Sequence, residues 1–199
     1  VIPIKTYERT HHMKQLLSLF LILLAFLCCS PSVYTAELTL TNTPVEVHFS
    51  PHGGCTAAIV DNLTNAKSEI LVQAYSFTSA PIAKALVDAH KRGVKVEVIL
   101  DKSQRTEKYT SATFLANMRI PVYIDAKHAI AHNKIIIIDR ETVITGSFNF
   151  TKNAEEKNAE NLIIIKSKEL ASIYIKTGLS IKNIQMSINQ GIKHGHKRK

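Results

Sequence analysis

The sequence is poor in cysteine. Three of its 199 residues are cysteines, and Cys28 and Cys29 lie in an apolar segment near the start, so Cys55 is the single thiol in the rest of the chain. One thiol excludes a framework of internal disulfides, and a hydrophobic core must therefore stabilise the fold. We interpret Cys55 as a small buried residue at the start of a helix; the alternative is a disulfide between subunits.

Sequence motifs that bind cofactors are also absent. The chain contains no glycine-rich nucleotide loop, no Cys-x-x-Cys pair and no cluster of residues with metal-ligand spacing. These absences exclude the common patterns for dinucleotide, thiol-redox and zinc chemistry. His194 and His196 are interpreted as part of a solvated basic end. We therefore predict no cofactor and no metal site.

No apolar run is long enough to cross a membrane. Leu16–Cys29 is shorter than the roughly 20 residues of a spanning helix. It follows Met13-Lys14 and leads to small residues that end at Ala36, which is the order of a secretory signal peptide. We expect export, cleavage of this segment and no stable membrane association afterwards. The alternative is a retained N-terminal anchor.

These features divide the chain into three parts. Upstream residues and the signal peptide occupy 1–36, one domain occupies 37–192, and a basic tail occupies 193–199. The formal charge is +9, and it falls to +7 when Lys5, Arg9, Lys14 and Glu8 leave with the leader. Such a domain suits a polyanion, either nucleic acid or an anionic membrane surface, and charge alone does not separate the two.

Short β-branched runs alternate with segments of helical periodicity. This alternation predicts an α/β domain with a mixed, mostly parallel β-sheet flanked by helices on both faces. The predicted strands are Val45–Phe49, Ile70–Phe77, Val94–Leu100, Val122–Ile124, Ile135–Ile138, Thr142–Thr145 and Leu162–Ile165, and the predicted helices are Cys55–Ala66, Pro81–Arg92, Thr110–Met118 and Lys168–Asn189.

Two polar pairs flank the most apolar strands. His132 and Lys134 stand two residues apart before the Ile135–Ile138 run, so they share one face of a strand. A turn and a second β-branched segment then bring Ser147 and Asn149 back toward them. A hydroxyl, a carboxamide, an ammonium and an imidazole therefore converge. Three of these groups suit phosphate oxygens, and the imidazole can act as nucleophile or as acid and base.

The spacing of these residues resembles a known signature. His-x-Lys-x4-Asp-x6-Gly-Ser-x-Asn is the motif of the phospholipase D superfamily, and the residues that fill it are His132, Lys134, Asp139, Gly146, Ser147 and Asn149. The chain looks in particular like the small, plasmid-encoded bacterial endonucleases of that superfamily, which carry a single HKD motif and work in chelator. The resemblance implies a phospholipase D-like fold, phosphodiesterase activity and a periplasmic or secreted bacterial protein.

The resemblance also assigns roles to individual residues. His132, Lys134, Asn149 and Glu160 are the implied catalytic residues, with Glu160 hydrogen-bonded to the imidazole. Phosphate binding falls to Lys134, Ser147 and Asn149. A surface position is the alternative for Glu160, since its neighbours Glu155 and Glu156 are interpreted as solvated charges. Asp139 and Gly146 are expected to be structural: Asp139 lies at a hairpin turn, and Gly146 removes a side chain that would keep a ligand from the backbone.

The superfamily uses two histidines, one from each copy of the motif, whereas this chain has one copy. The simplest solution is a twofold homodimer that brings His132 and its symmetry mate together. We therefore expect a metal-independent, sequence-nonspecific endonuclease that cleaves DNA or RNA through a phosphohistidine. A phospholipase acting on lipid head groups is the alternative, and it would gain from an exposed apolar patch, which the sequence does not indicate. A third reading is a basic module that binds polyanions without catalysis, but binding alone does not require a nucleophilic histidine.

Two further segments are weaker candidates for the site. Hydroxyl residues of Ser76–Ser79 follow a strand, so they either line the site or simply cap the next helix through Ser79. Lys102, Arg105 and Lys108 follow another strand end and could track a phosphate backbone, although such clusters are usually solvated surface.

Overall fold

The computed structural model describes residues 35–107 and 110–177, and all the elements in these ranges belong to the compact unit that begins at Leu38. Nearly all of the predicted signal peptide and the whole basic tail lie outside the described residues, as does Lys108. In the described ranges, no helix has both the length and the apolarity needed to cross a bilayer.

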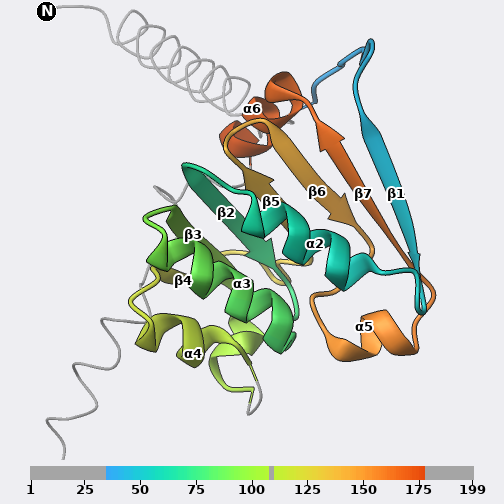
Figure 1. Cartoon of the computed structure of the whole chain (residues 1–199). Coiled ribbons are helices and arrows are strands. Elements are labelled where there is room, and N and C mark those ends of the chain that lie inside the picture. The colour runs from blue at the N-terminus through green and yellow to red at the C-terminus, as the bar shows by residue number, and fades with distance from the viewer. Residues whose placement is uncertain (1–34, 108–109, 178–199) are drawn as a thin grey trace, which may run out of the picture. The chain divides into compact units, whose positions relative to one another are not determined.

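The described residues build one seven-stranded sheet in the order β1-β7-β6-β5-β2-β3-β4 (Figure 1). Its strands are β1 (Val45–Ser50), β2 (Glu69–Ala74), β3 (Lys95–Asp101), β4 (Val122–Asp125), β5 (Lys134–Ile138), β6 (Thr142–Gly146) and β7 (Glu160–Lys166). The helices are α2 (Cys55–Thr64), α3 (Ala80–Lys91), α4 (Ala112–Asn117), α5 (Lys152–Glu156) and α6 (Lys168–Thr177), together with the 3-10 turn η1 (Lys102–Arg105).

The mixed α/β sheet is confirmed, but the prediction that most strands pair in parallel is wrong. Among the described strands, β2-β3 and β3-β4 pair in parallel, and the other four pairs are antiparallel. The reason lies in the connections. A parallel pair needs a long crossover, usually a helix, and the segment 126–133 between β4 and β5 contains none. The chain therefore re-enters the sheet from the end where β4 stopped, and β5 runs the opposite way.

Helices cover both faces of the sheet, as predicted. The larger core lies on the face under α2, α3 and α4, where it includes Ile59, Leu86 and Leu115, each with no exposed surface. On the other face, α6 packs over Val143 and Ile137. Cys55 belongs to the larger core, and burial, reinforced by the charge of Glu155, raises the pKa of its thiol to about 11. The thiol is thus protonated at neutral pH and inaccessible to a second subunit.

Glu155 has a structural role that differs from the solvated charge expected for it. Its carboxylate accepts hydrogen bonds from the backbone amides of Gly54, at 3.1 Å, and Thr56, at 2.7 Å. These amides begin α2 and have no partner inside the helix, so a carboxylate there is favourable. The contact spans about a hundred positions of sequence, and it fixes α5 against the start of α2.

Polar residues gather along one edge of the sheet, at which β1, β2, β3, β4 and β6 end and β5 and β7 begin. In the register, Ala74 of β2 lies beside Lys134, Gly146 lies beside Leu162, and Ser50 lies beside Glu160. The parallel strands β3 and β4 end at the same edge with Asp101 paired to Asp125. Since ligands of α/β sheets bind outside the ends of the strands, this edge is where the predicted site residues should meet.

Candidate active site

His132 and Lys134 meet at this edge. The ammonium of Lys134 donates to the backbone carbonyl of His132 at 2.8 Å, and it lies 3.2 Å from both ring nitrogens of the same residue. His132 is exposed, whereas Lys134 is buried, with 6% of its surface accessible. The imidazole is therefore open to a substrate, and the ammonium beneath it is fixed in direction.

Burial changes the electrostatics of Lys134. Removal from water lowers the pKa of the ammonium, and the negative charge of Glu160 opposes the shift in part. A buried cation costs free energy unless something compensates its charge. The arrangement therefore favours an anion beside His132.

Two buried carboxylates, which the sequence reasoning missed, hold the loop that carries His132. Asp101 accepts from the amide of Ala131 at 2.8 Å, and Asp125 accepts from the amide of Lys127 at 3.0 Å and from the His128 ring at 2.7 Å. Burial alone would raise the pKa of both carboxyls, but these hydrogen bonds outweigh it and hold each pKa below its usual value. Asp101 ends β3 and Asp125 ends β4, but an aspartate at a strand end does not show in the sequence which amide it will bind.

Ser147 is linked to Asn161 of β7. Its hydroxyl oxygen accepts from the Asn161 backbone amide at 3.1 Å and from the Asn161 side chain at 3.4 Å. A serine hydroxyl has two acceptor positions and one donor. Both acceptor positions are in use, so the hydroxyl hydrogen of this exposed side chain is free to donate to a substrate oxygen.

Gly146 is required by the fold and not by a ligand. Its φ is +146°, and a Cβ at this position would lie 2.2 Å from the backbone oxygen of Asn161. That oxygen accepts from the amides of Ser147 and Phe148. The glycine is structural as predicted, but it admits a neighbouring strand instead of a substrate.

Asn149 and Glu160 lie at the same edge with different surroundings. The side-chain oxygen of Asn149 is buried and has no hydrogen-bond partner among the described residues. Buried polar groups are nearly always paired, so this carboxamide is suited to a group from outside the chain. Glu160 accepts from Asn158 at 3.1 Å. The expected hydrogen bond from the His132 ring to Glu160 is not formed within the described part of one chain.

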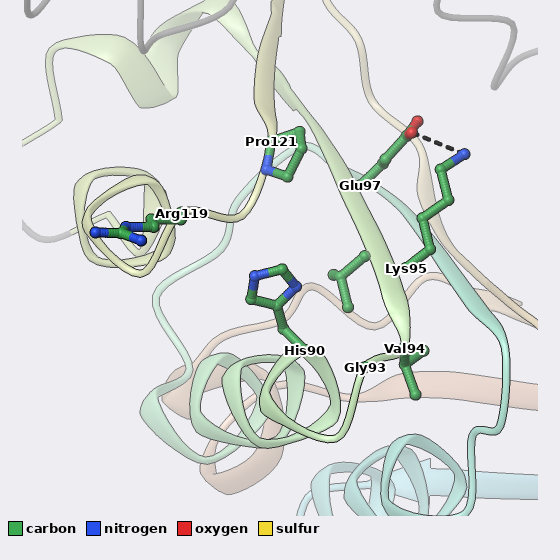
Figure 2. A pocket seen from close by; sticks show the side chains of 8 residues that line it. His90, Gly93, Val94, Lys95, Glu97, Arg119 and Pro121 are labelled. Atoms are coloured by element: carbon green, nitrogen blue, oxygen red, sulfur yellow. Dashed lines mark ion pairs between the residues drawn. The ribbon is translucent and has the colours of Figure 1, made fainter.

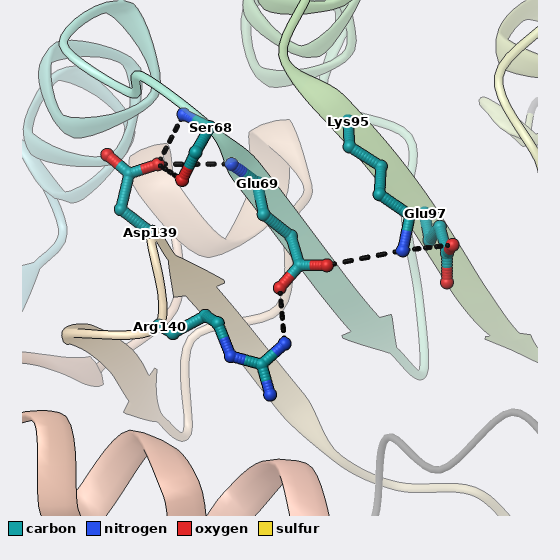
Figure 3. Close-up of polar contacts among 6 residues, drawn as sticks. All are labelled: Ser68, Glu69, Lys95, Glu97, Asp139 and Arg140. Carbon is teal, nitrogen blue, oxygen red and sulfur yellow. Dashed lines mark hydrogen bonds and ion pairs between the residues drawn. The ribbon is translucent and has the colours of Figure 1, made fainter.

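Asp139 of the motif contacts the segment that begins β2 and not the residues of this group (Figure 3). Its carboxylate accepts from the backbone amides of Lys67, Ser68 and Glu69 and from the Ser68 hydroxyl, at distances between 2.7 and 3.2 Å. These donors precede and begin β2, so Asp139 ties the β5-β6 turn to the start of β2. Glu69 continues the network through ion pairs with Arg140 at 3.1 Å and Lys95 at 3.3 Å.

Tyr75 is a neighbour of the site that the sequence reasoning did not single out. Its ring lies 4.5 Å from the His132 ring, centroid to centroid, and 5.2 Å from the Lys134 ammonium. Ser76 and Thr78 line a pocket with Tyr75 and Asn149. Ser79 occupies the N-cap position of α3 but makes no side-chain hydrogen bond there. Its backbone amide instead donates to the carbonyl of Phe150 at 2.9 Å, which fastens this loop to the segment after β6.

Other polar positions lie outside the group. Lys102 and Arg105 are exposed on η1, and Lys102 donates to the carbonyl of His128 at 3.3 Å. Within the described ranges, no three His, Cys, Asp or Glu side chains are close enough together to hold a metal ion. A separate pocket of about 300 Å³, lined by His90 and Arg119 among others, lies at the start of β3, opposite the end that carries Asp101 (Figure 2).

Comparison with known proteins agrees with this geometry. The family model described as cardiolipin synthase, PLD-like domain, matches residues 59–177. A Rickettsia felis protein named phospholipase D is 46% identical over 143 residues, which are 72% of this chain and 72% of that protein. A mouse protein named mitochondrial cardiolipin hydrolase is 30% identical over 155 residues, covering 72% of this chain and 70% of that protein.

The solved structure of Nuc from Salmonella typhimurium, titled a phospholipase D family member, superposes with a TM-score of 0.69 at 39% identity. The match covers 73% of this chain and 98% of Nuc. Family model, sequence relatives and fold all coincide with the motif that places His132 beside Lys134. The chain belongs to the phospholipase D superfamily and is a phosphodiesterase of that superfamily.

Proposed function

We propose that the protein is a metal-independent, sequence-nonspecific endonuclease that hydrolyses phosphodiester bonds of DNA or RNA. The observation that carries this proposal is the exposed His132 imidazole held over the buried ammonium of Lys134. The ammonium supplies a positive charge without a metal, and the surplus of basic residues attracts a polyanion.

The reaction uses one histidine from each subunit of a twofold dimer. One His132 attacks phosphorus and forms a nitrogen–phosphorus bond while the bond to the leaving oxygen breaks. The partner's His132 donates its proton to that oxygen, then takes a proton from water, and the water releases the phosphoryl group from the first histidine. Both imidazoles end as they began, and a diester is converted into a monoester and an alcohol.

Three side chains stabilise the phosphoryl oxygens. Lys134 balances charge, Ser147 donates its free hydroxyl hydrogen, and the carboxamide of Asn149 donates through its Nδ2 hydrogens. Glu160 raises the pKa of Lys134 against the effect of burial and so helps keep the ammonium charged. A contact between Glu160 and an imidazole is part of this proposal for the assembled dimer.

The surroundings of His132 support a dimer formed across the site. Ile130, two residues before it, has 61% of its surface exposed. The buried centre of an interface is rich in apolar side chains, and a dimer formed across His132 would cover Ile130. We further propose that the leader directs the protein to the periplasm or out of the cell, so that the substrate is extracellular nucleic acid.

Phospholipid remains the second candidate substrate because of one surface. The edge strand β1 exposes Val45, Val47 and Phe49 by 49%, 51% and 65%, and these residues share one face of the strand. The sequence does not indicate this patch, because the alternation of apolar residues along a strand does not show which face of the strand remains without a covering helix. This apolar strip could approach a lipid surface, and relatives named phospholipase D and cardiolipin hydrolase point the same way.

Two assays on one preparation decide between the substrates. Plasmid nicking and release of phospholipid head groups are measured for the wild type and for His132→Ala. We expect nicking that disappears in His132→Ala, with little head-group release. Head-group release that requires His132, without nicking, would keep the site and overturn the nuclease. Asp61→Asn changes an exposed residue on α2 and serves as the control, because it shows whether the preparation of a variant by itself lowers the activity.

A further inference from the structure

A groove leads away from His132, and apart from Asn149 the residues that line it have no role in the mechanism above. Two adjoining hollows of about 430 and 410 Å³ share Tyr75, Ser76 and Glu107, so together they form one trough, which we call the Tyr75 groove. Asn149 lines one end of it. Because Tyr75 also packs against the His132 ring, the groove begins where a scissile phosphate would sit.

The lining of the groove is polar, aromatic and almost neutral. Among the described residues that line it, Glu107 and Lys152 are charged, and Lys152 lies 3.5 Å from Glu156 on the same short helix. Side-chain amides of Asn153 and Asn158 and several hydroxyls supply the remaining donors and acceptors. Such a surface is not a track for phosphates. It suits a flat, uncharged ligand with hydrogen-bonding edges.

A buried glutamine holds the carboxylate of Glu107 in place. The side-chain nitrogen of Gln104 donates to its carboxylate, and Gln104 is itself buried, with 2% of its surface exposed. The oxygen of Gln104 accepts from the amide of Phe77 and from the hydroxyl of Thr110, both at 3.1 Å. The acid is thus oriented by a side chain anchored in the interior.

An acid near a phosphate site repels the substrate's charge, and a hydrogen-bond donor on the ligand would offset this repulsion. A carboxylate can only accept hydrogen bonds. A ligand that fits the groove therefore donates N–H or O–H groups to Glu107, and the neighbouring aromatic ring favours a flat face. A quaternary ammonium head group would satisfy the acid and the ring but leave the amides and hydroxyls unpaired.

We propose that the Tyr75 groove binds the nucleobase next to the scissile phosphate, with its face against Tyr75 and its N–H edge on Glu107. This proposal rests on the nuclease function proposed above. Guanine fits best, because its neighbouring N1–H and N2–H groups can both donate to one carboxylate. Those groups are engaged by cytosine in a duplex, so the base must be unpaired to enter. The chemistry tolerates any sequence, and the groove biases where it occurs.

Sequencing of cleavage ends tests the proposal. A single-stranded oligonucleotide pool of random sequence is cut by the wild type, by Glu107→Gln and by Glu141→Gln. The last variant makes the same change of charge at the β5-β6 turn, at the opposite end of the sheet. We expect guanine to be enriched at one position flanking the cut by about fivefold or more in the wild type. Glu107→Gln should bring this enrichment near one, and Glu141→Gln should preserve it.

The role of the Tyr75 ring is tested with the same oligonucleotide pool. Tyr75→Phe keeps the ring and should keep the enrichment, whereas Tyr75→Leu should reduce it. Enrichment is a ratio within one reaction, so it does not depend on any loss of overall rate through His132. A pool annealed to its complement should show weaker enrichment than the single strands.

Failure of the groove proposal can be distinguished from failure of the nuclease proposal. Cutting that requires His132 but shows no base bias, or a bias unchanged in Glu107→Gln, would overturn the groove proposal and leave the nuclease standing. Absence of any His132-dependent cutting would overturn both. Hydrolysis of a choline phospholipid that falls in Glu107→Gln, with no cutting of nucleic acid, would assign the groove to a head group.

Discussion

The carboxylate of Asp139 accepts hydrogen bonds from both the backbone amide and the hydroxyl of Ser68, at 2.7 and 2.8 Å. Asp139 belongs to the same short motif as His132, yet its contacts lie at the start of β2, whereas His132 lies beside the end of that strand. The motif therefore combines the proposed catalytic groups with a structural acid. Its fixed spacing reflects the length of β5, which separates the two.

Asp139→Asn should destabilise the fold. The amide cannot reproduce four donors converging on one carboxylate, and the expected loss is about 1–3 kcal/mol in the free energy of unfolding. Urea unfolding at neutral pH measures it, with Glu141→Gln on the same turn as the control. A variant as stable as the control would contradict the structural role.

The stability of the wild type should also fall in acid. Burial alone would raise the pKa of Asp139, but hydrogen bonds from Ser68, Glu69 and Lys67 outweigh it and hold the pKa below the unfolded value. A carboxyl with a depressed folded pKa stabilises the fold above its unfolded pKa, about 4, and loses this contribution as pH falls through the folded pKa. Asp139→Asn should therefore show a shallower loss of stability below about pH 4. An unchanged slope would assign the acid sensitivity to other carboxyls.

Lys134→Met should lower the activity and raise the stability of the fold. Activity should fall on the order of 100- to 1000-fold, because one charge-stabilising donor is lost. The free energy of unfolding should rise by about 1 kcal/mol, since a charge has been removed from a buried position.

The pH dependence of stability checks the same residue. The folded pKa of Lys134 lies below its unfolded value, so the unfolded chain binds more protons between the two values and wild-type stability rises with pH there. Lys134→Met should lack this rise. If the variant is less stable than the wild type at neutral pH, the lysine contributes more through its contacts than its burial costs.

The rate of cleavage should depend on pH as a bell. Two symmetry-related imidazoles must together hold one proton, so the pair is inactive when both are protonated and when neither is. The measurement is kcat/KM for one and the same substrate across pH 4.5 to 9. A rate that rises steadily with pH would indicate a base acting without a general acid.

Mixing subunits tests the shared site. If each reaction needs His132 from both chains, a dimer of wild type with His132→Ala is inactive. A tenfold excess of His132→Ala, allowed to exchange with wild type, should therefore lower the activity by about tenfold. His132→Ala that has been prevented from exchanging by cross-linking is the control. Unchanged activity after complete exchange would show that one chain suffices.

Much of the fold was readable from local patterns. The Ile135–Ile138 run could only be a buried strand, and Lys134 at its start contacts His132, which lies before the strand and not on it. Strand direction was not readable in the same way, because it depends on whether a connection crosses the sheet. Only the three-dimensional path of residues 126–133 shows that β5 turns back.

The supporting groups of the site were harder to predict because their partners are distant in sequence. Asp101 holds the amide of Ala131, thirty positions away, and Glu155 holds the start of α2. An isolated acid in a sequence gives no sign of such a partner. Tyr75 looked like one more apolar residue at a strand end, and its contact with His132 follows from the register of β2 against β5.

The most direct test is plasmid nicking by the chain from Glu37 onward, in excess EDTA, with His132→Ala purified in parallel. The account predicts nicking that EDTA does not diminish and that His132→Ala abolishes. Since a trace nuclease would appear equally in both preparations, the variant decides the origin of the activity. Nicking that is lost in EDTA, or that persists in His132→Ala, would contradict a metal-free reaction through this histidine.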